Sequence, residues 1–198
     1  MHRDAHVKIV GLLLAAGSAS RFGSDKLQHP LPHGVAIAVQ AARHLLAEVP
    51  RVVAVVRPGA QATARALAAE GCEVVECERA AEGMGASLAC AARAAGAAEG
   101  YLVALGDMPF VRPSSIAAVR DALAAGALLA APYWHARRGH PVGFAGRLRA
   151  ELEALSGDEG AKRVLGAHEV QLVKVPVGDP GTVRDIDRPS DLAPPLSV

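Results

Sequence analysis

The sequence predicts an α/β fold in which a mostly parallel sheet lies between two layers of helices, as in Rossmann-like proteins. Short runs of Val and Leu alternate with stretches that have helical apolar spacing, and this order pairs strands in parallel through crossovers. The first run, residues 7–14, is almost continuously apolar, as expected of a strand buried on both faces. Hydrophobic residues make up 51% of the chain but aromatics only 3%, so Ala, Val and Leu must build the core.

Helix-breaking residues set the expected boundaries. Pro50 ends the first helix, Gly71 ends the second, and Pro113 opens the fourth. Residues 133–141 read as an exposed turn, after which the strand at 142–145 pairs back as a hairpin and becomes the one antiparallel strand. We expect strands at 7–14, 51–56, 73–76, 101–105, 128–131, 142–145 and 171–175. We expect helices at 35–49, 61–70, 85–95, 114–125, 148–155 and 160–166.

No internal repeat or long linker interrupts this order, so we expect a single domain over residues 1–198 with a core of about 7–192. The net charge is only +1, from 21 basic and 20 acidic residues, which argues against a general nucleic-acid binder. Three cysteines with no zinc-like spacing do not form a disulfide framework. The start lacks the apolar centre of a signal peptide and no apolar run would span a membrane. We therefore expect a soluble cytoplasmic protein without membrane partners.

In sheets of this kind, ligands bind outside the carboxyl ends of the strands. The loop after the first strand reads LAAGSASRFGSDK over residues 14–26. Backbone amides of Ala16, Gly17 and Ser18 can converge on phosphate oxygens, and Arg21 and Lys26 supply positive charge. The loop has neither the dinucleotide glycine spacing nor the G-K-[ST] ending of a P-loop. A surface loop with two solvated cations is the alternative.

Two acidic segments follow other strands. Asp107 comes directly after the apolar strand at 101–105 and is placed to ligate Mg²⁺, unless it only caps the next turn. Asp185 and Asp187 lie on the same side of an extended segment, because side chains alternate along it. One of them is a candidate for a second metal carboxylate; the alternative is that they only supply charge at the start of the last helical turn.

These stretches, in this order, resemble the nucleotidyltransferase superfamily that includes the molybdenum cofactor nucleotidyltransferases. Residues 14–26 match its L-A-A-G-x-x-x-R-x-G-x-x-K motif without a gap, and residues 106–109 (GDMP) are similar to its metal loop. Residues 82–88 resemble the segment that contacts base and ribose. Residues 138–141 (RGHP) and 156–161 are similar to stretches of the cytidylyltransferase branch. Residues 185–192 (DIDRPSDL) resemble its ending, with Arg188 and Ser190 in place of the commoner Thr and Glu.

The resemblance covers residues 7–192 and implies a nucleotidyltransferase fold and activity. It implies Mg²⁺-dependent transfer of CMP from CTP to molybdopterin with release of pyrophosphate, and the Ala-Ala-Gly form of the first loop favours CTP over GTP. Catalytic roles fall to Lys26, Arg21 and Asp107, and Mg²⁺ ligation to Asp107 and Asp187. Acceptor binding falls to His140 and Arg138. Nucleotide binding falls to Leu14, Ala15, Ala16, Gly17, Ser18, Arg21, Lys26, Gly83 and Ser87.

Several alternatives stay open. The protein could be a guanylyltransferase or transfer a nucleotide to another phosphorylated small molecule. It could instead be a non-catalytic chaperone that carries molybdenum cofactor, and in either case it could contact a molybdoenzyme transiently. A nicotinamide-dependent dehydrogenase is disfavoured by the missing glycine spacing. Ser87 could simply be a helix N-cap, and His140 could be a solvated surface histidine.

Overall fold

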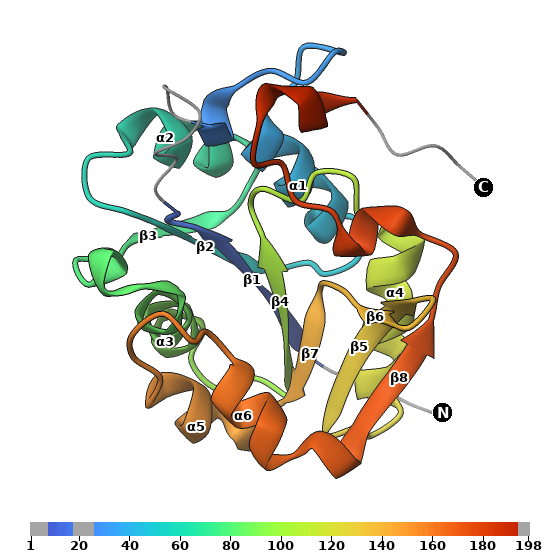
Figure 1. Cartoon of the computed structure of the whole chain (residues 1–198). Helices are drawn as coiled ribbons and strands as arrows, with labels where there is room; N and C mark the ends of the chain where they lie inside the picture. The colour runs from blue at the N-terminus through green and yellow to red at the C-terminus, as the bar shows by residue number, and fades with distance from the viewer. Residues whose placement is uncertain (1–7, 18–25, 194–198) are drawn as a thin grey trace, which may run out of the picture.

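The computed structural model describes residues 8–17 and 26–193 (Figure 1). Within these residues the strands form one eight-stranded sheet in the order β3-β2-β1-β4-β7-β5-β6, and β8 pairs with β5. The strands are β1 (Ile9–Ala15), β2 (Val52–Val56), β3 (Glu73–Glu76), β4 (Gly100–Leu105), β5 (Leu129–Trp134), β6 (Arg137–Arg138), β7 (Val142–Ala145) and β8 (Leu172–Pro176). The α-helices are α1 (Ile37–Leu46), α2 (Gln61–Ala69), α3 (Met84–Ala95), α4 (Pro113–Ala124), α5 (Arg149–Glu153) and α6 (Lys162–Ala167).

The sheet is mostly parallel, as predicted. Strand β1 pairs in parallel with β2 and β4, β2 pairs in parallel with β3, and β8 pairs in parallel with β5. Strand β7 runs antiparallel to both β4 and β5, so the antiparallel strand expected at 142–145 is confirmed. The two-residue strand β6, antiparallel to β5, was not predicted. Strand β6 is too short to show an alternating pattern, and it lies within residues 133–141, which were expected to form a turn.

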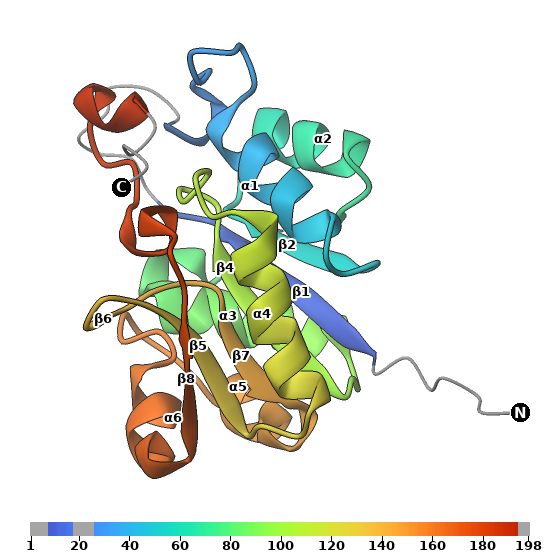
Figure 2. The same cartoon turned by 90° about the vertical axis from the view of Figure 1, so that its right-hand side faces the viewer.

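Helices cover both faces of the sheet, which confirms the three-layer architecture (Figure 2). Successive residues of β1 point to opposite faces. Leu13 packs with residues of α1, α2 and α4, whereas Leu12 packs with residues of α3, α5 and α6. Both leucines are fully buried. The nearly continuous apolar run that predicted a central strand therefore reflects burial on two sides.

Most boundaries differ from the prediction by one or two residues, and three of the differences have a clear structural reason. Helix α1 begins at Ile37 rather than at residue 35, because Ala36 has an extended backbone. Helix α6 begins at Lys162 rather than at residue 160, because Gly160 has φ of +56°. Strand β5 continues to Trp134 because Tyr133 and Trp134 pair with β6.

The described helices are short. The longest of them, α3 and α4, have 12 residues each. A helix needs about 20 apolar residues to cross a bilayer. No helix in the described part of the chain is long and apolar enough to do so.

Asp179 anchors the segment that leads from β8 to the acidic residues near the C-terminus. Its side chain is almost completely buried. It accepts hydrogen bonds from the backbone N–H of Arg112 (2.9 Å), the hydroxyl of Ser115 (2.8 Å) and the backbone N–H of Gly181 (3.0 Å). The carboxylate therefore ties the start of α4 to the chain that follows β8. The sequence analysis assigned no role to Asp179.

We expect Asp179→Ala to lower the free energy of unfolding by about 3 kcal/mol, because it leaves buried donors without an acceptor. Asp179→Asn keeps one carbonyl oxygen and should lose less. Urea unfolding monitored by circular dichroism measures both variants. Asp121→Ala is the control, since that side chain is 67% exposed and should change stability by less than about 0.5 kcal/mol. Equal stability of Asp179→Ala and Asp121→Ala would contradict the anchoring role.

Candidate active site

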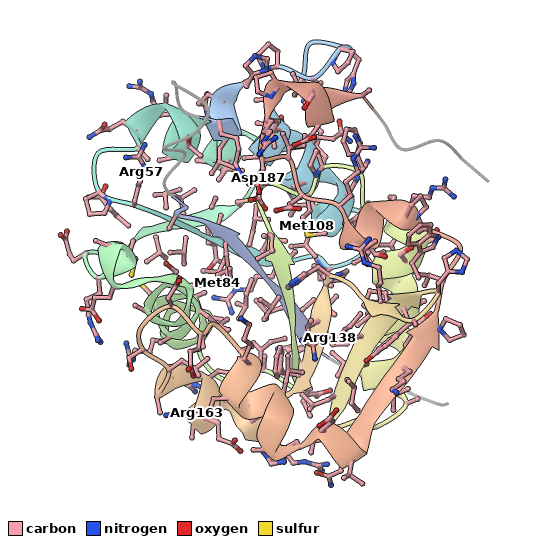
Figure 3. The ribbon with its side chains drawn as sticks, in the orientation of Figure 1. Arg57, Met84, Met108, Arg138, Arg163 and Asp187 are labelled. Atoms are coloured by element: carbon pink, nitrogen blue, oxygen red, sulfur yellow. The ribbon has the colours of Figure 1, made fainter. Side chains whose placement is uncertain are left out.

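Backbone hydrogen bonds bring three distant segments together at the carboxyl ends of β1 and β4. The N–H of Gly106 donates to the carbonyl of Leu14 (2.9 Å), which sets the end of β4 beside the first loop. The N–H of Ile186 donates to the carbonyl of Asp107 (2.9 Å), which brings the C-terminal segment to the same place. Ile186 is fully buried in the core. Figure 3 shows Asp187 at this end of the sheet.

Three carboxylates gather at this junction. Oxygen atoms of Asp107, Asp185 and Asp187 all lie within 4.8 Å of one another. The buried Ile186 between the last two confirms that they share one side of the extended segment. Like charges at this spacing repel, and a divalent cation with a preference for carboxylate oxygens would relieve that repulsion. The donor set therefore fits Mg²⁺ or Mn²⁺, and it adds Asp185 to the two predicted ligands.

Asp191 caps the last helical turn. The sequence analysis had considered a role at the start of that turn as the alternative for Asp185 and Asp187. The Oδ2 atom of Asp191 accepts hydrogen bonds from the backbone N–H groups of Asp187 (3.1 Å) and Arg188 (2.8 Å). These bonds lower the pKa of Asp191 and fix the start of the last 3₁₀ turn, Pro189–Leu192. The side chains of Asp185 and Asp187 therefore do not cap this turn and belong to the acidic cluster with Asp107.

Lys26 reaches into the acidic cluster. Its Nζ atom lies 3.0 Å from Oδ2 of Asp107 and 3.3 Å from Oδ1 of Asp187. Only 12% of the Lys26 side chain is exposed, so the alternative of a solvated cation is wrong for this residue. Burial by itself would lower the pKa of Lys26, but the two carboxylates outweigh it and raise that pKa. The ammonium group therefore stays charged beside the carboxylates.

The first loop begins next to this cluster. Leu14 and Ala15 belong to β1 and are buried, Ala16 is buried, and Gly17 is exposed. Ala15 pairs with Val56 on one side, and Leu14 pairs with Leu105 on the other. The chain thus leaves the sheet between the ends of β2 and β4. Ser18 and Arg21, also predicted to bind the nucleotide, lie outside the described residues.

The predicted nucleotide residues of α3 lie at the start of that helix. Gly83 has φ of +125°, and a Cβ atom there would come within 2.6 Å of the Cα of Asp158. Only glycine fits at this close approach. Ser87 is not an N-cap, because the helix begins at Met84, and its buried hydroxyl donates to the carbonyl of Gly83 (3.4 Å). Figure 3 shows Met84 away from Asp187, toward α3.

The sequence analysis expected residues 133–141 to form an exposed turn, but His140 is not exposed. It is half-buried, its N–H donates to the carbonyl of Thr182 (2.8 Å), and its Nδ1 atom lies 3.5 Å from the carbonyl oxygen of Val103. The alternative of a solvated surface histidine is therefore wrong. Burial lowers the pKa of His140 although Val103 and Asp107 oppose this shift. Arg138, by contrast, is exposed on β6.

Comparison with known protein families agrees with this geometry. Residues 11–172 match the family model of the MobA-like NTP transferase domain. The chain belongs to this family. The matched residues include the first loop, Lys26 and Asp107, whereas Asp185 and Asp187 lie beyond the end of the match. Membership makes the protein a nucleotidyltransferase-family enzyme. No curated protein matches the chain.

Solved structures share the fold over almost the whole chain. The structure of Rv0371c from Mycobacterium tuberculosis H37Rv is 26% identical, with a TM-score of 0.79, and the match covers 93% of this chain and 95% of that one. Rv0371c in complex with manganese is 24% identical, with a TM-score of 0.77 and the same coverage. Molybdopterin-guanine dinucleotide biosynthesis protein A from Archaeoglobus fulgidus is 23% identical, with a TM-score of 0.64, and the match covers 92% and 94%.

Proposed function

We propose that the protein is a Mg²⁺-dependent cytidylyltransferase that transfers CMP from CTP to molybdopterin and releases pyrophosphate. The observation that carries the proposal is the junction of Lys26 with three carboxylates at the end of the phosphate-binding loop motif. A charged lysine beside a divalent-cation site suits a triphosphate, whose oxygens need both kinds of positive charge. The family supports nucleotidyl transfer, and the manganese complex of the related fold supports a divalent metal.

In the proposed reaction, an oxygen of the acceptor phosphate attacks the α-phosphorus of CTP. A new P–O bond forms to the acceptor as the bond to the leaving pyrophosphate breaks. The acceptor phosphate is already ionised near neutral pH, so no side chain needs to remove a proton. Positioning and charge neutralisation are the protein's main tasks in such transfers.

Each proposed residue has a task in that reaction. Asp107 and Asp187, with Asp185 beside them, would hold Mg²⁺, which supplies charge neutralisation for the phosphate oxygens when bound. Lys26 and Arg21 would neutralise charge on the α-phosphate and the leaving pyrophosphate. The backbone of residues 14–18 would approach the triphosphate, since the side chains of residues 15–18 are small. Gly83 and Ser87 would contact the cytidine part of CTP.

We assign acceptor binding to His140 and Arg138. His140→Ala should raise the KM for molybdopterin about tenfold and leave the affinity for CTP unchanged, because one hydrogen bond to the acceptor is lost. Steady-state kinetics together with CTP calorimetry check this. His135→Asn on the same hairpin is the control, because asparagine tolerates the positive φ of 53° at that position. Equal loss of CTP and acceptor affinity would contradict the assignment.

A pyrophosphate-release assay with CTP, Mg²⁺ and molybdopterin tests the proposed function. Release that requires all three supports it. Release with GTP and not CTP would make the protein a guanylyltransferase, and release with another phosphorylated acceptor would correct the substrate. Tight binding of molybdenum cofactor with no release from any nucleotide would favour the chaperone alternative.

A further inference from the structure

A pocket of about 490 Å³ lies beside the Asp107 loop, on the side of the sheet that α1 covers. In Figure 1 the loop after β4 runs next to α1. Leu31 and Pro32 form one apolar part of its lining, and Pro109 and Phe110 form another. The guanidinium of Arg184 lies 5.5 Å from the centre of the Phe110 ring, a cation–π contact that holds this ring in place. The size suits a small molecule.

The polar part of the pocket is a chain of three side chains. Nε2 of His33 lies 3.1 Å from Oε1 of Gln40, and Nε2 of Gln40 lies 2.6 Å from Nε2 of His44. Because the amide nitrogen of Gln40 donates, Nε2 of His44 must accept. In the neutral ring the proton then sits on Nδ1 of His44, which is buried, and this ring also interacts with the backbone of Val111.

Among the described residues that line the pocket there is no Lys, Arg, Asp or Glu. Burial lowers the pKa of His44, so this ring is neutral near pH 7. A charged ligand would lose water here without gaining a counter-charge. Flat proline and phenylalanine surfaces accept a planar ring, and the amide and imidazole groups offer hydrogen bonds to its edge.

We propose that this pocket binds an uncharged, planar nitrogen heterocycle with a hydrogen-bonding edge. Two sources share this chemistry: the pterin ring of an acceptor and the base of a free nucleoside. The pocket is built from residues that the proposed nucleotide and acceptor sites do not use. The pterin outcome rests on the proposed function, whereas the nucleoside outcome goes beyond it.

Two connections link the pocket to the candidate active site. Pro109 and Phe110 follow Asp107 after one residue, so a ligand against them contacts the loop that carries the metal carboxylate. His44 also lines an internal cavity of about 10 Å³ that it shares with His140. A space of that size holds about one water molecule. A heterocycle in contact with His44 would therefore be separated from His140, the proposed acceptor residue, by this small cavity.

Calorimetry and NMR with two phosphate-free probes, 6-hydroxymethylpterin and adenosine, test the proposal on the full chain. We expect saturable binding of at least one probe, with shifts of the Gln40 side-chain amide signals. Gln40→Leu keeps the side-chain size but removes the hydrogen bonds, and should weaken binding about tenfold. Gln61→Leu, in the exposed first turn of α2, is the matched control and should bind as the wild type does.

The pattern of probes identifies the source of the ring. Binding of the pterin alone assigns the pocket to an acceptor ring, and binding of adenosine alone or equally well assigns it to a nucleoside base. His33→Ala, at an exposed position, is a second variant should Gln40→Leu not fold, and it should weaken binding about threefold. Absence of saturable binding by both probes, or binding that shifts Gly17 and not Gln40, overturns the proposal. Pyrophosphate release from CTP is measured separately, so failure here is distinguishable from failure of the proposed function.

Discussion

Asp107→Ala is expected to lower metal-dependent nucleotidyl transfer by about 100- to 1,000-fold, because it removes a central carboxylate of the proposed metal site. Asp107 faces Asp185 and Asp187 and pairs with Lys26 (3.0 Å). Its loop is held by backbone hydrogen bonds that the substitution leaves in place, such as that from Ile186. Pyrophosphate release measured across a range of Mg²⁺ concentrations checks the expectation.

The fold should survive this substitution. The Asp107 side chain is 27% exposed, and its loss also relieves repulsion within the acidic cluster. We expect the free energy of unfolding to change by less than about 1 kcal/mol. Asp121→Ala, on the exposed side of α4, should keep full activity. Normal turnover by a folded Asp107→Ala protein would remove this residue from the metal site.

Lys26→Ala is expected to lower kcat about 100-fold, the effect of removing one preorganised donor from developing phosphate charge. The substitution also changes metal binding in a definite direction. Lys26 shares the Asp107 and Asp187 oxygens that a cation would use, so without it the cluster is more negative. Mg²⁺ should therefore raise the melting temperature of Lys26→Ala more than that of the wild type.

Lys26→Arg keeps the charge and should recover part of the lost turnover, though a guanidinium differs in shape from an ammonium group. Lys174→Ala on the edge strand β8 is the control and should change neither turnover nor Mg²⁺ stabilisation. If Lys26→Ala has unchanged kinetics, Lys26 has no role in the reaction. An equal Mg²⁺ effect on both proteins would mean that Lys26 does not compete with the metal.

Much of the fold was predictable because local pattern and burial agree. The apolar run of β1 predicts a central strand, and a central strand in an α/β sheet places its following loop at the ligand edge. The position of Asp107 after β4 follows from the same rule. The shared side of Asp185 and Asp187 follows from side-chain alternation around the buried Ile186.

The rest depends on contacts between distant parts of the chain. Lys26 meets Asp107 across 81 residues and Asp187 across 161, and no local pattern encodes such a meeting. The burial of His140 comes from Thr182 and Val103, which the sequence places far from it. The anchoring by Asp179 is likewise tertiary, with partners at the start of α4.

Calorimetric binding of CTP, GTP, ATP and UTP, with and without Mg²⁺, tests the central claim most directly. The proposed cytidylyltransferase activity predicts that CTP binds selectively. The three carboxylates predict that Mg²⁺ strengthens this binding by at least about tenfold. Asp107→Ala should lose the Mg²⁺ effect and keep a weak metal-independent affinity. Binding that prefers GTP would contradict the choice of nucleotide. Failure to bind any nucleotide, in the presence of Mg²⁺ and acceptor, would contradict the account as a whole.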